Sequence, residues 1–169
     1  MKQILILMIL TITAAQALAD DIHLQINGAI MAASCEVEGG SKNKTVEMGE
    51  ALASDFSQPH DWGPRVPFEL SVINCPATIT AVEAAFSGVR DPHENNAYLN
   101  NGTGRGLALQ IIESNSGMYM LPDGEPATAP VDPTTHSATW DFSARYIRTT
   151  DAFAPGSFDT AVQVTFTYR

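Results

Sequence analysis

Apolar and polar residues alternate one by one along several separate stretches of the chain. Because successive side chains of a β-strand point to opposite faces, this period of two predicts strands with one buried face. The longest examples lie near the two ends, in residues 22–30 and 162–168. Between them the same pattern recurs on Phe68-Leu70-Val72, Val82-Ala84-Phe86, Leu107-Leu109-Ile111 and Trp140-Phe142-Ala144-Tyr146.

Loops rich in proline, glycine and asparagine separate these predicted strands. They cover residues 57–67, 91–106 and 121–133, and no long segment has the period of an amphipathic helix. Short strands joined by such loops are typical of an antiparallel β-sandwich of the immunoglobulin type. A length of 169 residues favours one such domain.

The first 19 residues have the features of a secretory signal peptide. Lys2 supplies a positive charge, an apolar run follows from Ile4 to Ile12, and Ala17-Leu18-Ala19 fits the cleavage pattern. A membrane anchor is disfavoured because a spanning helix needs roughly 20 apolar residues. We therefore predict an exported mature chain with no transmembrane span.

Cys35 and Cys75 are the only two cysteines of the chain. Export places them in an oxidising compartment, where an even number of cysteines favours a disulfide over free thiols. A zinc site would need more ligands at close spacing. In the chain-entropy model, closing a loop of this length stabilises the fold by about 4 kcal/mol.

The charge of the chain argues against nucleic acid as a partner. The full chain has 9 basic and 19 acidic residues, a net charge of −10, and loss of Lys2 with the signal peptide makes it −11. Such a surface lacks the basic stripe that phosphate-binding proteins need. The sequence therefore predicts no nucleic-acid interface.

Candidate catalytic and metal-binding residues are scattered. The stretch Asp91-Pro92-His93-Glu94 is the best ligand cluster, yet a metal needs three or four converging ligands. The glycine-rich residues 102–106 precede a strand, which favours a turn over a phosphate loop. We therefore predict no catalytic site, no metal site and no cofactor. The other histidines are dispersed, at His23, His60 and His136.

The two tryptophans are the candidates for stacking on a sugar ring. Trp140 opens an alternating stretch and fits a core position better, whereas Trp62 lies in a predicted loop.

Both ends of the mature chain are unusual for a closed sandwich. The last alternating stretch runs to Arg169, so no later strand is left to pair with its free side. Residues 20–33 form a strand-like arm outside the cysteine loop. Such an arm could join the sheet of its own domain or add to the sheet of another molecule, and the pattern alone allows both.

Four stretches carry a more specific pattern. They are residues 22–35 (IHLQINGAIMAASC), residues 68–76 (FELSVINCP), residues 82–88 with 101–111, and residues 142–147 with 155–158 and 164–169. Their order, the cysteine spacing and Tyr168 in the second-last position resemble the chaperone-usher pilins of the type 1 fimbrial class. The short arm before Cys35 is more similar to minor or adaptor subunits than to the major rod subunit.

The resemblance implies an all-β fold, an incomplete immunoglobulin-like antiparallel β-sandwich that lacks its final strand and is completed by a donor strand. It divides the chain into a signal peptide (1–19), an N-terminal donor-strand extension (20–34) and a pilin domain (35–169). A periplasmic chaperone would fill the open groove first. At an outer-membrane usher, the arm of a neighbouring pilin subunit would then replace the chaperone.

The resemblance also assigns roles to individual residues. The donor side chains would be those facing one side of the arm, with Gly28 as the small residue that allows close approach: Ile22, Leu24, Ile26, Gly28 and Ile30. The edge of the acceptor groove would be Val162, Val164, Phe166 and Tyr168. Tyr168 and Arg169 would be the chaperone contact.

The implied function is that of a structural subunit of a bacterial fimbria at the cell surface, exported through the periplasm and contributing to cell adhesion, and not an enzyme. A small secreted sugar-binding adhesin is the alternative. It is disfavoured because adhesins of such systems carry a separate lectin domain before the pilin domain, for which this chain has no room. A secreted hydrolase is disfavoured because no catalytic motif is present.

Overall fold

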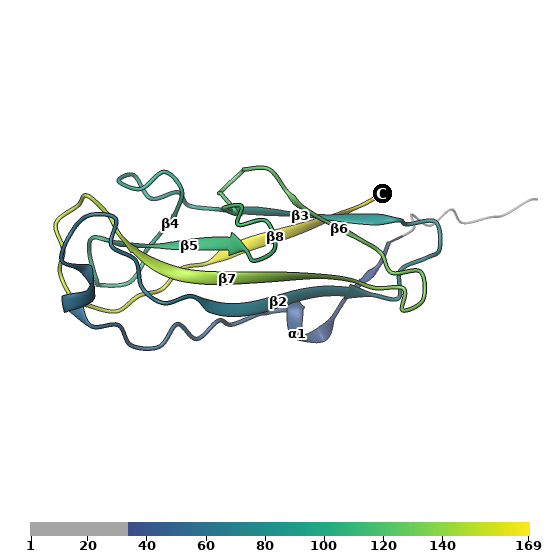
Figure 1. Cartoon of the computed structure of the whole chain (residues 1–169), viewed down its shortest axis with the longest axis horizontal. Helices are drawn as coiled ribbons and strands as arrows, with labels where there is room; N and C mark the ends of the chain where they lie inside the picture. Colours follow the sequence, from purple (N-terminus) through teal and green to yellow (C-terminus); the bar gives the residue numbers. More distant parts are fainter. Residues whose placement is uncertain (1–33) are drawn as a thin grey trace, which may run out of the picture. The chain divides into compact units, whose positions relative to one another are not determined.

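The computed structural model describes residues 34–169, which form two antiparallel β-sheets stacked as layers (Figure 1). Most of the strands are short, and the helical elements are single turns. The elements are β1 (Glu36–Val37), α1 (Gly39–Lys42), a 3-10 turn (Ala53–Phe56), β2 (Val66–Ile73), β3 (Ala81–Gly88), β4 (Tyr98–Leu99), β5 (Leu107–Glu113), β6 (Ala127–Pro130), β7 (Ala138–Arg148) and β8 (Val162–Tyr168).

The larger sheet has the strand order β1-β2-β7-β5-β4 and the smaller sheet has the order β6-β3-β8. All paired strands are antiparallel. In register, Phe68 of β2 lies opposite Phe142 of β7, and Phe86 of β3 lies opposite Val164 of β8. The predicted antiparallel sandwich is therefore confirmed.

The core lies between the two sheets and is built from the apolar positions of the alternating strands. Phe86 of the smaller sheet meets Phe142 of the larger one edge to face, with ring centroids 5.0 Å apart. Trp140 is only 2 % exposed, and its indole Nε1 donates a hydrogen bond to the carbonyl of Ala127 at 3.1 Å. The predicted core position of Trp140 is confirmed. The hydrogen bond satisfies the indole N–H, which burial would otherwise leave without a partner.

Two of the predicted loops contain short strands. Residues 91–106 include β4, and residues 121–133 include β6, which ends at Pro130. Proline is tolerated there because β6 lies at the edge of its sheet, where the missing N–H interrupts no central ladder. The loops were predicted from composition. Composition does not reveal a strand of two to four residues that is held extended by pairing with its neighbours.

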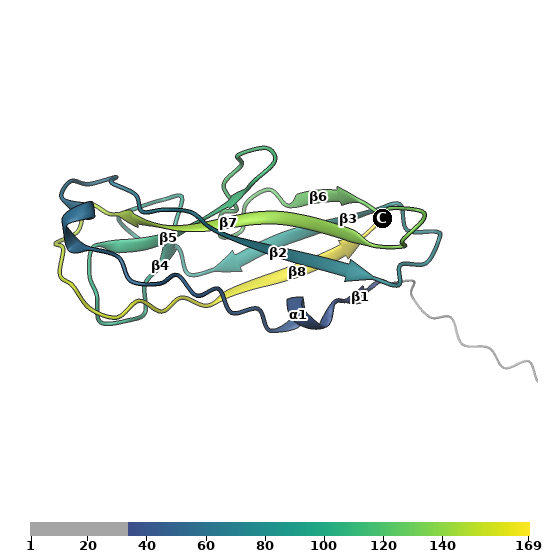
Figure 2. The same ribbon diagram turned by 60° about the horizontal axis from the view of Figure 1, so that its bottom comes forward.

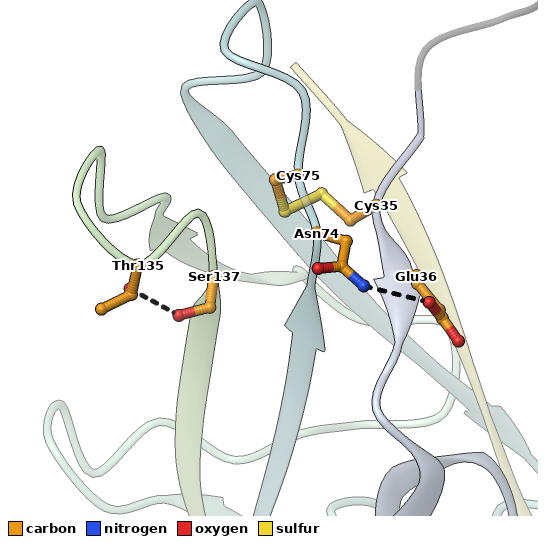
Figure 3. The surroundings of a disulfide bond; sticks show 6 residues. All are labelled: Cys35, Glu36, Asn74, Cys75, Thr135 and Ser137. Carbon is orange, nitrogen blue, oxygen red and sulfur yellow. Dashed lines mark hydrogen bonds between the residues drawn. A yellow bond between two sulfur atoms is a disulfide. The ribbon is translucent and has the colours of Figure 1, made fainter.

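The predicted disulfide joins Cys35 to Cys75 across a separation of 40 residues (Figure 3). It lies where β1 runs beside the end of β2, with Glu36 opposite Ile73. Next to it, the side-chain amide of Asn74 donates to the carboxylate of Glu36 at 3.2 Å. The bond thus fastens the first described residues of the domain to β2.

The predicted signal peptide and the predicted donor arm up to Ala33 lie outside the described residues. Within residues 34–169, no helix is long and apolar enough to cross a membrane.

Replacing both cysteines by serine should lower the free energy of unfolding by about 2–4 kcal/mol, because the unfolded chain regains the entropy of an open loop. Urea unfolding monitored by the fluorescence of buried Trp140 measures the change, with Ser114→Ala as an exposed control. An unchanged unfolding midpoint in the double variant would contradict the stabilising role of the bond.

Candidate functional site: an apolar groove beside the last strand

β8 is an edge strand with one paired side. Within the described chain its only ladder is with β3, from Val82 opposite Tyr168 to Gly88 opposite Val162. Its side chains alternate strictly between half-buried and exposed, so one face of the strand turns toward the core and the other toward solvent. The backbone groups along the second side of β8 are therefore available to another strand.

A groove of about 930 Å³ opens along this free side of β8. One wall is β8 itself and the other is the segment from Val37 to Gly49, and Figure 2 shows both on the same side of the domain. The floor is apolar and comes from both sheets: Phe68, Leu70, Phe86, Leu109, Ile111, Ala144 and Tyr146. The groove therefore reaches down to the sandwich core along a strand edge.

The second wall has little regular structure. Residues 43–49 follow α1 and form no strand, although Val46 and Met48 are partly buried against the core. Charged groups lie on the walls and at the ends of the groove rather than on its floor: Lys42, Lys44, Glu47 and Asp159. An extended peptide with apolar side chains on one face matches both the shape and the polarity of this groove.

The predicted groove-edge residues divide into two sets. Val162, Val164 and Phe166 line the groove, and the ring of Phe166 packs on buried Trp140 at 5.3 Å between centroids. Tyr168 shares their face of β8 and packs against the core, but it lies beyond the groove lining. Partial burial raises the pKa of its phenol above the ordinary value.

Arg169 anchors the end of β8 to β3. Its guanidinium donates two hydrogen bonds to the Glu83 carboxylate, at 2.7 and 2.9 Å, and its carbonyl oxygen accepts one from the backbone N–H of Thr80 at 2.7 Å. The hydrogen bond from Arg169 lowers the pKa of Glu83. The last strand is thus held firmly on its paired side while its other side stays open.

The other candidate residues have local structural roles. His60 bonds to the Glu94 carboxylate through Nδ1 at 2.9 Å, and Asp91 accepts a hydrogen bond from the backbone of His93 at 2.8 Å. Residues 102–106 form a bent segment with one β-bridge, from Arg105 to Ala154, and they lead into β5 rather than into a helix. In the described part of the chain, no three His, Cys, Asp or Glu side chains are grouped so as to hold a metal ion.

The sequence pattern did not predict the role of the segment that forms the second wall. Its signal is the short alternation Val46-Glu47-Met48, in which two apolar residues flank a charged one. Three residues are too few to separate a half-buried segment from a solvated loop by periodicity. Only the packing of the two sheets shows that this segment faces β8.

Val164→Glu should abolish binding of an apolar β-strand peptide to the groove, because the carboxylate would lie unpaired on an apolar surface. Thr165→Glu is the matched control, since Thr165 neighbours Val164 but is exposed on the opposite face. Peptide titration by fluorescence anisotropy measures both. Equal loss of affinity in the two variants would show that the peptide does not occupy the groove.

Comparison with known proteins agrees with this architecture. The sequence profile of the fimbrial protein family matches residues 24–169. Protein FimG of Escherichia coli K12 is 26 % identical over 160 residues, covering 95 % of this chain and 92 % of that protein. The fimbrial-like protein YdeS of the same organism is 31 % identical over 118 residues, covering 68 % of this chain and 66 % of its own length.

The fold is similar to that of solved pilus subunits. The P pilus rod subunit PapA superimposes with a TM-score of 0.69 at 17 % identity, covering 80 % of this chain and 99 % of the PapA chain. The family profile spans all of the described residues, the groove and both of its walls included. The chain therefore belongs to the fimbrial protein family, whose members are structural subunits of bacterial surface fimbriae.

Proposed function

We propose that this chain is a subunit of a chaperone-usher fimbria that accepts a β-strand from a neighbouring subunit and donates its own N-terminal extension, residues 20–34, to another. The observation that carries the proposal is the apolar groove along the unpaired side of β8. A solved chaperone-usher pilus supports it, because a chain of that pilus has the same fold and superimposes with a TM-score of 0.68.

Strand donation would supply two things that the domain lacks: hydrogen-bond partners for the free backbone groups of β8 and apolar side chains that fill the groove. A strand laid beside β8 hydrogen-bonds to its free backbone groups, and every second side chain enters the groove. The inward set of the arm would be Ile22, Leu24, Ile26, Gly28 and Ile30. Each large side chain of this set contributes about 1.5–3 kcal/mol when it is fully buried.

A subunit whose groove is empty needs a protecting partner before assembly, because an apolar strand edge is an aggregation site. We infer that a periplasmic chaperone covers the groove and contacts the end of β8 at Tyr168 and Arg169. An outer-membrane usher would then exchange the chaperone for a donor arm. Residues 1–19 would direct the chain to the periplasm and be removed, and residues 35–169 would form the assembled pilin domain.

The proposed role is structural and involves no catalysis or cofactor. The work of the domain is the exchange of one β-strand for another, which requires a groove and an edge but no reacting side chain. The breadth of the family match, which includes nearly all of the mature chain, favours a fimbrial subunit over a self-contained sugar-binding adhesin. Its contribution to adhesion would come through the fimbria that it builds.

A peptide of residues 20–33 should raise the melting temperature of a pilin domain that lacks its own arm. Gly28→Leu in this peptide should abolish the effect, because a bulky side chain in the inward register overpacks the groove. Asn27→Ser should leave the effect intact, because Asn27 would face outward in the proposed register. The acceptor is first this chain without its arm and then a neighbouring subunit.

Equal stabilisation by the Gly28→Leu and Asn27→Ser peptides would refute the assigned register. Fibres that incorporate an armless chain as efficiently as the full mature chain would refute strand donation itself.

Coexpression with the cognate chaperone should increase the soluble yield of the mature chain severalfold. Tyr168→Ala combined with removal of Arg169 should reduce that gain, because both changes fall on the proposed contact. Thr167→Ala, on the exposed face of β8, is the control. A stable monomer recovered in equal amount without the chaperone would contradict the need for protection.

A further inference from the structure

Two arginines lie close together on the outer face of the larger sheet, away from the groove. Arg145 is in β7 between Ala144 and Tyr146, which both line the groove, so its side chain points to the opposite face. Arg65 directly precedes Val66, whose register partner is Ala144. Partial burial lowers the pKa of the Arg145 guanidinium, and the positive charge of Arg65 also contributes to lowering it.

Neither of these arginines forms a salt bridge with a carboxylate within residues 34–169. Carboxylates are not scarce, since the chain has 19 acidic and 9 basic residues. The acidic residues Glu69 and Asp141 share the same face, but Asp141 is four positions along β7 from Arg145, roughly 13 Å away at the rise of a strand. Two neighbouring guanidinium groups without an anion form a site of positive potential.

The Arg145 side chain is held in place by a relay of polar side chains. Its Nε donates to the side-chain oxygen of Gln110 at 2.8 Å, and its Nη2 donates to the Tyr119 hydroxyl at 3.1 Å. Gln110 is 1 % exposed and donates in turn to Asn96 at 2.6 Å. Because a guanidinium has five N–H donors, three remain for a ligand at a fixed position.

Two exposed aromatic rings flank the same guanidinium. Trp62 is 52 % exposed although it is among the largest side chains, and the guanidinium carbon of Arg145 lies 5.0 Å from the centroid of its ring. Tyr119 is 36 % exposed. Backbone bridges tie Trp62 to Ile147 of β7 and Tyr119 to Ile112 of β5, so the backbone of both residues is held beside the sheet.

We propose that Arg145, Arg65, Trp62 and Tyr119 form a binding site for a saccharide that bears a carboxylate. A planar guanidinium with free N–H groups matches the two oxygens of a carboxylate. Exposed aromatic rings offer the apolar faces on which a sugar ring packs, and their hydroxyl and N–H groups bind its polar edge. The aromatic pair favours an acidic sugar over an acidic peptide, which would need only the charges.

The proposed site would stay open when a strand occupies the groove. It lies on the face of β7 opposite to the groove, so a donor strand or a chaperone strand in the groove does not cover it. The proposal goes beyond a role in fibre assembly and does not depend on strand exchange. Besides its role in assembly, the subunit would let the shaft or tip of the fimbria bind acidic carbohydrate.

Saturation-transfer NMR and titration on the purified mature chain, with folding checked by circular dichroism, would test the site. The probes are trigalacturonate with its methyl ester and sialyllactose with lactose, so that each acidic saccharide has a neutral counterpart. A peptide of four glutamates tests the alternative source of carboxylates. We expect at least one acidic saccharide to bind about tenfold more tightly than its neutral counterpart.

Variants would then locate the binding. Arg145→Gln should weaken it by about tenfold or more, Arg65→Gln by a smaller factor, and Trp62→Ala more than Trp62→Phe. Arg105→Gln is the matched control, because it removes one positive charge from a residue outside the site. If Arg145→Gln fails to fold, exposed Arg65 and Trp62 still provide the test.

Four results would overturn the proposal. The first two are that neither acidic saccharide binds and that the neutral counterparts bind equally well. The third is an equal loss of affinity in Arg105→Gln and Arg145→Gln. The fourth is that tetraglutamate binds as tightly as the saccharides and that its binding is insensitive to Trp62→Ala. None of these results would bear on strand donation, which is tested by peptides in the groove.

Discussion

The free side of β8 governs how the rest of the domain is built. β8 pairs with β3 on one side only, and its inward side chains border an apolar groove. A long, apolar, unpaired strand edge attracts other strands, and most proteins block such an edge with charges, bulges or a covering segment. In this domain the charges lie on the walls and at the ends of the groove, and the floor remains apolar.

The described residues hold the two walls of the groove in place from outside it. The Cys35–Cys75 disulfide ties the beginning of one wall to the end of β2. The ion pair of Arg169 with Glu83 ties the end of the other wall to β3. Because these contacts lie at the ends of the walls, the space between them is available to a strand without disturbing either. The contacts that hold the walls thus make the groove a defined part of the fold.

Much of the fold could be predicted because its longer strands alternate clearly. The apolar positions of β2, β3, β5, β7 and β8 follow the period of two, and Trp140 was assigned to the core on that basis. The strands β4 and β6 were missed because pairing with neighbours, rather than their own composition, holds them extended.

The candidate sites were harder to predict. The residues of β8 that line the groove were predictable from alternation and family resemblance, but the opposite wall at residues 43–49 depends on how the sheets pack. The cluster around Arg145 joins Trp62, Gln110 and Tyr119, which are far apart in sequence and share no motif. The register of β5 and β7 places Gln110 opposite Arg145. Backbone bridges from Trp62 to Ile147 and from Tyr119 to Ile112 bring the two aromatic residues beside them.

Amide hydrogen exchange along β8 would show whether its free side accepts a strand, because exchange reports whether each backbone N–H is hydrogen-bonded. The domain without its arm would be compared with and without a peptide of residues 20–33. We expect alternate amides between Val162 and Tyr168, those facing away from β3, to become protected on addition of the peptide. Protection confined to β4 or β6, which also lie at sheet edges, or no change in β8 would contradict strand acceptance at this edge.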